Sequence, residues 1–441
     1  MPTAQEMAPW PFVPSGPMVE IERAEGCFLY AKNGQSILDA SGGAIVSNIG
    51  HGRAEIAEAV AESMGKYDYV VPPFATEDRL GLVERLQKTW LPKHLTRVHL
   101  SSGGSEAVDV ALRLARLYHL GRGEEKRSKI IGRDISYHGT TVATLSVGGH
   151  NSRRKGLEPM WIQTPLAPTP YPLRHHERFD GECGEDCAQA LEDIILAEGP
   201  DTIAAVIGEP IIGSSGGAIV PPNNYWPKVR EICDRHGILL IADEVMTGFG
   251  RTGKRFGCEH WDLKADIMVS GKGLTAGYAP LVGVFATDAL VDVLVQNQQS
   301  LMFYTYGGQS SACAASNAVL DIMEREKLVE RVQEMAPVLE RHLNRLAQHP
   351  HVAEIRGRGF LWSLELVKDR ETLARFPVDA NITNKVVGAG MANGAFFYPG
   401  GTGSVRDIIT LGPPYIITED EIDQMVTILE KSIDSAVAAA N

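Results

Sequence analysis

The chain has 441 residues, of which 44% are hydrophobic, and a formal net charge of −13 at pH 7. This length is enough for about two or three domains with large hydrophobic cores, and the composition is that of an ordinary globular protein. The negative charge argues against nucleic acid as a partner, because binding a phosphate backbone needs a basic surface. No apolar run in the sequence is long enough to cross a membrane, so we predict no membrane partner.

The N-terminus and the cysteines indicate a cytoplasmic protein. Residues 1–17 have neither the basic region nor the apolar stretch of a secretory signal, and we expect an extended arm there. The six cysteines are sparse, which is typical of reduced thiols in the cytoplasm. One group, His175-His176 followed by Cys183 and Cys187, has looser spacing than zinc sites usually have. We therefore predict no metal site, and instead a polar loop that leads into a helix near residues 188–197.

The pattern from residue 98 onward predicts a mostly parallel sheet. Before it, short alternating strands are expected in residues 18–41 and amphipathic helices in residues 56–64 and 79–88. Strands then alternate with helices, and several strands are apolar throughout, which indicates burial on both faces. The expected strands are 98–100, 130–131, 202–207, 238–242, 267–269 and 281–286, and the expected helices include 106–120 and 225–235.

The C-terminal part predicts a smaller α+β domain. Helices are expected at 312–325 and 328–348, strands at 352–355, 361–367 and 408–411, and a final helix after a capping box at Thr418–Glu421. We expect the N-terminal strands to join this domain. The predicted division is an arm with strands of the small domain (1–50), a large domain (51–319) and the C-terminal small domain (320–441).

Two strand ends carry the residues on which a chemical interpretation depends. Lys272 follows an apolar strand inside the run Ser270-Gly271-Lys272-Gly273, and a lysine in such a confined place can lose its proton and form imines with carbonyl compounds. A lysine in a surface turn would show the same local pattern. Asp243 ends another apolar strand, where a buried carboxylate is costly unless it faces a cation.

The turn Ser102-Gly103-Gly104-Ser105 joins an expected strand to an expected helix. Its glycines let backbone amides approach a ligand, and the start of a helix attracts anions, so the turn could hold one phosphate group. An ordinary capped turn between a strand and a helix explains the same residues equally well.

Tyr137-His138-Gly139 follows the strand near residue 130. Tyr137 at a strand end can stack on a flat ligand or pack against the sheet. His138 could act as a base, although a hydrogen-bonded structural histidine is the more usual role. A planar heteroaromatic ligand with a phosphate, an aldehyde and a ring nitrogen would satisfy the lysine, the aspartate and the turn together, and pyridoxal phosphate has these groups.

With these residues in place, the sequence resembles the class III (omega) aminotransferases, which are fold-type-I pyridoxal-phosphate enzymes. The stretch from Ala242 to Gly253, with Lys272 downstream, carries most of the resemblance. Further matches are Ser-Gly-Gly-Ser-Glu-Ala at 102–107, Tyr-His-Gly at 137–139, Gly-Glu-Pro at 208–210, Tyr304-Thr305-Tyr306-Gly307-Gly308 and Gly412-Pro413-Pro414. The resemblance implies an α/β large domain with a mostly parallel seven-stranded sheet and a smaller α+β domain built from both chain ends.

The resemblance also implies roles for individual residues. Lys272 and Asp243 are the catalytic pair: Lys272 holds the cofactor and then transfers the proton, and Asp243 pairs with the protonated ring nitrogen. Tyr137 and Val245 contact the two ring faces. Thr305 reaches the phosphate from a neighbouring subunit, so that a homodimer shares each active site; whether dimers pair into tetramers stays open. The full set of implied cofactor contacts is Ser102, Gly103, Gly104, Ser105, Tyr137, His138, Glu209, Asp243, Val245, Lys272 and Thr305.

Substrate contacts are expected at Tyr69, Glu209 and Arg406. Tyr69 lies in an aromatic and proline-rich segment, 67–74, that could line an entrance. Arg406 is a candidate for binding a carboxylate, and a surface arginine beside Asp407 is the alternative. Met246, where some amino-acid-specific branches have glutamine, and Gln309-Ser310, where many relatives have His-Pro, are departures that discourage assigning a well-known substrate.

The expected activity is transfer of an amino group from an amine or an omega- or alpha-amino acid to a 2-oxo acid, pyruvate or 2-oxoglutarate, by a ping-pong mechanism. The alternative is a racemase, epimerase, aminomutase or decarboxylase on the same scaffold, because all of these begin from the same cofactor complex.

Overall fold

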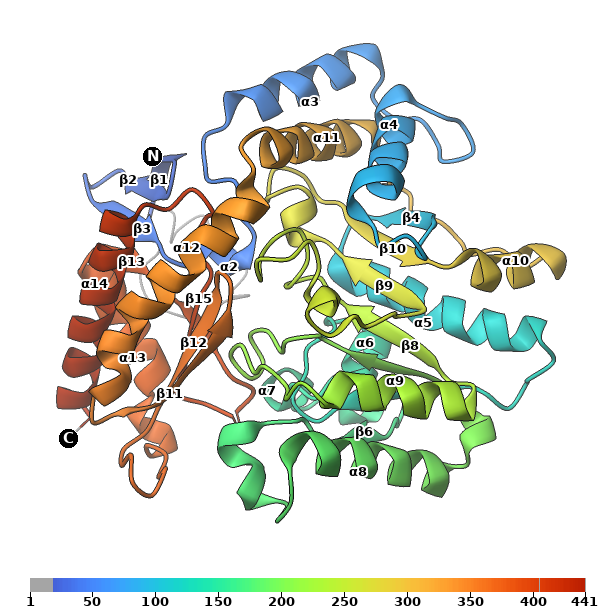
Figure 1. Ribbon diagram of the computed structural model, residues 1–441. Coiled ribbons are helices and arrows are strands. Elements are labelled where there is room, and N and C mark those ends of the chain that lie inside the picture. Colours follow the sequence, from blue (N-terminus) through green and yellow to red (C-terminus); the bar gives the residue numbers. More distant parts are fainter. Residues whose placement is uncertain (1–18, 404, 441) are drawn as a thin grey trace.

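The computed structural model describes residues 19–403 and 405–440. The expected N-terminal arm, residues 1–17, lies outside the described residues. Figure 1 shows a large sheet with helices on both faces and, beside it, a smaller group of strands and helices that contains both ends of the described chain. Within the described residues, no helix is long and apolar enough to cross a membrane.

The large sheet has seven strands, as expected. Their order across the sheet is β4 (Arg97–Ser101), β10 (Val282–Ala286), β9 (Ile267–Ser270), β8 (Leu239–Asp243), β7 (Ile203–Gly208), β5 (Lys129–Arg133) and β6 (Leu166–Ala167). Strand β10 runs antiparallel to both of its neighbours, β4 and β9, and the other strands are parallel. The prediction of a mostly parallel sheet is therefore confirmed.

Burial on both faces explains why the central strands are apolar throughout. Strands β7 and β8 are buried at every position. In β8, Ile241 packs into the core beneath α5 (Gly104–Gly121), whereas Leu240 and Ala242 pack into the core that contains α8 (Cys183–Glu198) and α9 (Tyr225–His236). Alternate side chains of one strand thus belong to two different cores, so neither face can be polar.

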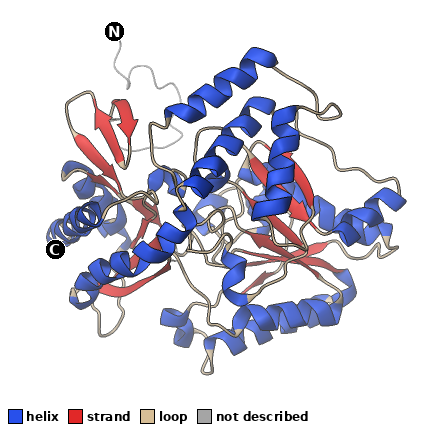
Figure 2. Cartoon of the chain, turned by 45° about the horizontal axis from the view of Figure 1, so that its top comes forward, coloured by secondary structure: helices blue, strands red, loops and turns tan. Residues whose placement is uncertain are grey.

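Figure 2 shows further helices around the strands of the large sheet. They are α2 (Gly42–Ile45), α3 (Ala54–Lys66), α4 (Glu77–Arg85) with a π-turn at Leu86–Trp90, α6 (Val142–Val147), α7 (Asn151–Arg154), α10 (Asp288–Gln296) and α11 (Ser310–Arg325). Helix α11 packs against α3 and α4. The predicted domain boundary between residues 319 and 320 falls inside α11, and the division into domains stays a prediction.

Two small sheets form the second part of the molecule. One has the order β1 (Ile21–Glu25), β2 (Phe28–Ala31), β3 (Ser36–Asp39), β13 (Ala395–Phe396), and the other has β11 (Val352–Arg358), β12 (Leu361–Leu366), β15 (Ile408–Leu411), β14 (Tyr398–Gly400). The pairing of β3 with β13 joins segments from opposite ends of the sequence. Helices α12 (Leu328–Leu343), α13 (Ile382–Ala392) and α14 (Glu419–Ala438) pack around these sheets.

The capping box predicted for the final helix is present. The Thr418 hydroxyl accepts a hydrogen bond from the Glu421 amide, and the Glu421 carboxylate accepts one from the Thr418 amide at 2.8 Å. The amides at the start of α14 have no acceptor within the helix, and these two side chains supply one for each. The two hydrogen bonds therefore fix the residue at which α14 begins.

Candidate active site

Three ionisable side chains lie at one edge of the large sheet. Asp243 is the last residue of β8, Lys272 lies two residues beyond β9, and Glu209 directly follows β7. These strands are parallel neighbours, so their carboxyl ends share the edge at which open α/β sheets bind ligands. A cavity of about 250 Å³ opens there. It is lined by Gly104, Ser105, Tyr137, His138, Gly139, Glu209, Ser214, Asp243, Val245, Met246, Lys272 and Val282.

Lys272 is half-buried and has a left-handed backbone conformation, with φ of 45°. This conformation costs a residue other than glycine about 1–3 kcal/mol, and the surrounding fold must sustain it. The side-chain Nζ donates a hydrogen bond to the Ala44 carbonyl of α2 at 2.9 Å. Burial lowers the pKa of Lys272 to about 8, although the negative charges of Asp243 and Glu209 oppose that shift. A substantial fraction of this amine is therefore neutral and nucleophilic near physiological pH.

Asp243 is almost fully buried, with 4% of its surface exposed. Its Oδ2 lies 2.7 Å from His138 Nδ1, and its Oδ1 accepts a hydrogen bond from the Val245 amide at 3.1 Å. Among the described residues, His138 is the one ion-pair partner of Asp243. The buried Nε2 of His138 has no hydrogen-bond partner in the described part of the chain. In the described residues the Asp243 carboxylate is thus paired with a histidine and not with a lysine or an arginine.

Glu209 supports the segment that carries Tyr137. One carboxylate oxygen accepts from the Tyr137 amide at 3.1 Å and the other from the Gly213 amide at 2.8 Å. Burial raises the pKa of Glu209. Because both oxygens already bind backbone amides, Glu209 is engaged by the protein itself although it also lines the cavity.

The glycine-rich turn divides into two functional halves. The amides of Ser102 and Gly103 both donate to Glu106 Oε2 at 3.1 Å, which leaves them no capacity for a ligand. Gly104 and Ser105 begin α5 and line the cavity. Amides in the first turn of a helix have no acceptor within that helix, and they favour a bound anion.

The Tyr137-His138-Gly139 segment packs directly onto this turn. A side chain at Gly139 would place its Cβ 2.5 Å from Ser105 Oγ, and the φ of Gly139 is 137°, which also requires glycine. The Ser105 hydroxyl accepts a hydrogen bond from the Thr140 amide at 3.0 Å. The close approach brings the Tyr137 side chain and the start of α5 to the same cavity.

Five of the expected residues lie outside this cavity: Ser102 and Gly103, whose amides bind Glu106, and Thr305, Tyr69 and Arg406. Thr305 is exposed in the loop between α10 and α11, and Tyr69 is exposed near Tyr306. Arg406 lines a second cavity, of about 550 Å³. There it donates to the Phe376 carbonyl at 2.8 Å and lies 3.7 Å from Asp407.

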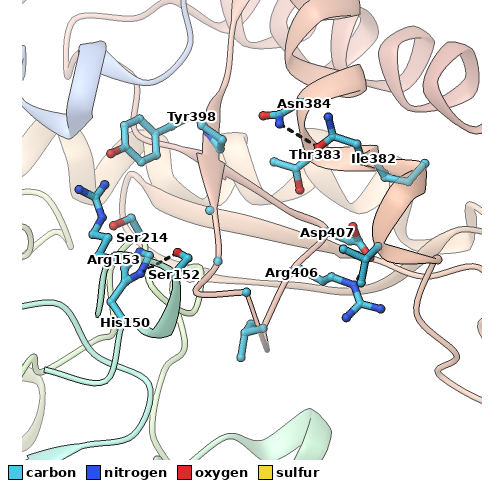
Figure 3. A pocket seen from close by; sticks show the side chains of 17 residues that line it. His150, Ser152, Arg153, Ser214, Ile382, Thr383, Asn384, Tyr398, Arg406 and Asp407 are labelled. Carbon is cyan, nitrogen blue, oxygen red and sulfur yellow. Dashed lines mark hydrogen bonds and ion pairs between the residues drawn. The ribbon is translucent and has the colours of Figure 1, made fainter. Parts of the chain in front are cut away.

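The second cavity reveals a residue that the sequence did not indicate. Arg153 lines it, and its guanidinium carbon lies 4.9 Å from the centre of the Tyr137 ring. Ser214 lines both cavities. Figure 3 shows Arg153, Ser214 and Tyr398 on one side of the cavity and Arg406 on the other. In the sequence, Arg153 stands in a polar stretch with no motif around it, so only the fold brings it beside Tyr137.

The cavity therefore brings together the amine of Lys272, the buried carboxylate of Asp243 and the first two residues of α5, Gly104 and Ser105. The chain matches the family model for class III aminotransferases over residues 13–433. It belongs to this family and is an aminotransferase.

Named relatives cover nearly the whole chain. It is 36% identical to a putrescine–pyruvate aminotransferase of Pseudomonas aeruginosa, over 95% of this chain and 91% of that protein. Among solved structures, an (S)-enantioselective omega-transaminase from Thermomicrobium roseum has a TM-score of 0.90 and 34% identity, covering 96% of this chain and 93% of the other. The omega-transaminase of Pseudomonas jessenii in complex with PMP has a TM-score of 0.89 and 30% identity, with coverage of 96% and 93%.

Class III aminotransferases depend on pyridoxal 5'-phosphate, and the residues of the cavity suit this cofactor. The unmatched carboxylate of Asp243 would face the ring nitrogen, and the free amides at the start of α5 would hold the phosphate. Lys272 offers the amine for the aldehyde. Of the residues proposed as cofactor contacts, Ser102, Gly103 and Thr305 do not line the cavity within this chain.

Proposed function

We propose that the protein transfers an amino group from an amine or amino acid to a small 2-oxo acid such as pyruvate, in two half-reactions that share one site. The convergence of Lys272, Asp243 and Ser105 on a single cavity of about 250 Å³ carries this proposal. A shared site suits a ping-pong mechanism, because the donor leaves before the acceptor enters.

The protein residues would divide the chemistry as follows. When bound, pyridoxal 5'-phosphate withdraws electrons from the carbon that bears the amino group. Asp243 would pair with the opposing ring nitrogen, and His138 fixes the orientation of the Asp243 carboxylate through a contact of 2.7 Å. The neutral Nζ of Lys272 takes the proton from the substrate carbon and returns it, and its pKa of about 8 suits both directions near neutral pH.

Arg153 is our candidate for binding the acceptor's carboxylate. It contacts the Tyr137 ring at the junction of the two cavities, and arginine pairs with carboxylates in a bidentate manner. Arg406 is already hydrogen-bonded to the Phe376 carbonyl and lies beside Asp407, so its charge is partly compensated. The Arg153 guanidinium can pair with one carboxylate, which favours pyruvate as the acceptor over 2-oxoglutarate.

Part of the cavity lining is apolar. Val245, Met246 and Val282 belong to this part, and none of them offers a hydrogen bond. This lining favours donors with an aliphatic or aromatic body, and the putrescine–pyruvate relative makes diamines an informative part of a donor panel.

The test is a panel of amine and amino-acid donors, each with pyruvate and with 2-oxoglutarate, followed through the visible spectrum of the bound cofactor and through product formation. We expect donor alone to convert the spectrum and pyruvate alone to restore it. Failure to form ketone or aldehyde from every donor would refute the proposal. Loss of a substrate's optical rotation without any acceptor would instead establish a racemase or epimerase.

We also propose that the active site is completed in a homodimer. Thr305 is exposed and lies within a group of exposed apolar side chains, which a monomer in water would not favour. This group consists of Tyr69, Phe74, Met302, Phe303 and Tyr306. The rings of Tyr69 and Tyr306 meet edge to face at 6.3 Å, so the two segments form one surface.

A mixed dimer tests the sharing of sites. Lys272→Ala and Thr305→Ala chains, co-expressed with different tags and purified as the mixed species, would contain one site with both native residues. We expect each variant alone to be impaired and the mixed dimer to recover about half of the wild-type activity, because one of two sites is intact. A fully active Thr305→Ala enzyme, or no recovery in the mixed dimer, would refute a shared site.

A further inference from the structure

A second group of reactive side chains lies away from the cofactor cavity. His175, Cys183 and Cys187 each offer a metal-ligand atom, and these atoms all lie within 4.8 Å of one another. None of the three lines the cavity that contains Lys272. In residues 19–403 and 405–440, no other group of three or more histidine, cysteine or acidic side chains meets this criterion.

The fold brings the three residues together from two elements. Cys183 is the first residue of α8 and Cys187 lies one turn later, so both thiols share one face of the helix. His175 comes from the short 3₁₀ segment Pro172–Glu177. The expected polar loop before residue 188 is thus wrong in part, because the cysteines already belong to the helix.

The histidine is held as metal-binding histidines usually are. Its Nε2 lies 2.9 Å from Asp186 Oδ2, and its ring stacks on Phe179 with the centroids 5.2 Å apart. In metal sites a carboxylate that contacts one ring nitrogen of a histidine fixes the orientation of the ring. His175 and Cys187 are both buried, with 5% and 1% of their surface exposed, so these ligands are largely shielded from water.

We propose that His175, Cys183 and Cys187 bind one zinc ion per chain. Sulfur and imidazole are the ligands that zinc prefers, and two thiolates balance its charge. Zn–S and Zn–N distances of about 2.3 and 2.0 Å place tetrahedral ligands roughly 3.5 Å apart, so separations of up to 4.8 Å need to close by about 1.3 Å or less. A water molecule would take the fourth position, and a cavity of about 330 Å³ reaches His175 but neither cysteine.

The ion would strengthen the connection between the large sheet and the second part of the molecule. Arg174, next to His175, donates to Glu365 of β12 at 2.7 and 2.8 Å, and Tyr171 bonds the same carboxylate. The zinc site would fix the segment that carries both residues to the start of α8. Its role is therefore structural, and its loss should lower thermal stability more than it alters the cofactor spectrum.

Metal analysis of untagged protein tests the proposal without reference to activity. The protein is dialysed against chelator, incubated with zinc alone, desalted, and measured by plasma mass spectrometry. We expect about one zinc per chain, at least about ten-fold less in Cys183→Ser and in His175→Ala, and unchanged zinc in His176→Ala. His176 is the matched control, because it is the exposed neighbour of His175 and lies outside the group.

Cobalt and thiol measurements give independent results. Cobalt(II) in place of zinc should give a sulfur-to-metal charge-transfer band that Cys183→Ser lacks. Less than a tenth of a zinc per chain in the reconstituted wild type, or equal zinc in wild type and Cys183→Ser, would overturn the proposal. The free thiols of the denatured protein can also be counted, and all six cysteines should react. A count of four would overturn the zinc proposal, because a Cys183–Cys187 disulfide would then occupy the site.

Discussion

The replacement Asp243→Asn isolates the charge at the end of β8. Asparagine keeps the shape of the side chain, and its amide oxygen can still accept the hydrogen bond that the Val245 amide donates at 3.1 Å. What disappears is one negative charge on a side chain that is 4% exposed and has His138 as its ion-pair partner. The substitution should therefore change the electrostatics of the site with little change in its structure.

The expected loss follows from Coulomb's law. Two unit charges about 3 Å apart in an effective dielectric of about 20 attract by about 5 kcal/mol, and a neutral hydrogen bond in place of the charged one returns about 1 kcal/mol. The remaining ~4 kcal/mol corresponds to about a thousand-fold in kcat/KM, since each factor of ten is about 1.4 kcal/mol. Steady-state transamination kinetics at saturating cofactor would measure this loss in kcat/KM.

Glu244→Gln is the matched control. Glu244 adjoins Asp243 and is fully buried, but its carboxylate accepts from Gly257 and Cys258 amides at 2.8 and 2.6 Å and does not line the cavity. This change should lower the melting temperature and leave kcat/KM within about five-fold of wild type. Activity of Asp243→Asn within ten-fold of wild type, with full cofactor occupancy, would refute the electrostatic argument.

Three further predictions concern the amine, the acceptor and the link between the two parts of the molecule. Capture of added cofactor by the cofactor-free enzyme should accelerate as pH rises through about 8. Lys272 is mostly protonated and unreactive below its lowered pKa, and mostly neutral above it. A stopped-flow rate that does not change between about pH 6.5 and 9.5 would contradict this prediction. Arg153→Ala should lower kcat/KM for pyruvate about 10- to 100-fold, and Arg153→Lys should lower it less. Lys155→Ala, a change at an exposed neighbour, should stay near wild type. An unchanged kcat/KM in Arg153→Ala would exclude the carboxylate contact. Arg174→Ala should lower the free energy of unfolding by about 3–5 kcal/mol in urea, because it leaves the buried Glu365 with one fewer cation, and a loss below about 1 kcal/mol would show the pair to be dispensable.

The sequence was most informative where one physical constraint dominated. Strands β7 and β8 are apolar at nearly every position because both faces are covered, and that pattern predicted their place in the sheet. The capping box at Thr418 predicted the start of α14 because its two hydrogen bonds are local. Lys272 and Asp243 were singled out because each stands at the end of an apolar run, and their catalytic roles stay a prediction.

Contacts between distant segments could not be predicted in this way. The apolar pattern of β10 is the same in either direction, so its antiparallel orientation was not expressed in the sequence. Glu106 accepts hydrogen bonds from the amides of Ser102 and Gly103, and of the expected phosphate-binding turn only Gly104 and Ser105 line the cavity. Arg153 reaches Tyr137 only through the fold, and the same is true of His175 and the two cysteines of α8.

We propose that Lys272 is the amine that holds the cofactor. Reduction of the wild-type holoenzyme with borohydride, followed by peptide mass mapping, should place the cofactor's mass on the peptide that contains Lys272 and on no other lysine. The same treatment of Lys272→Ala should leave no covalent label, and transamination should fall by at least about 100-fold. A label on a different lysine, or a Lys272→Ala enzyme that keeps most of its activity, would contradict the account.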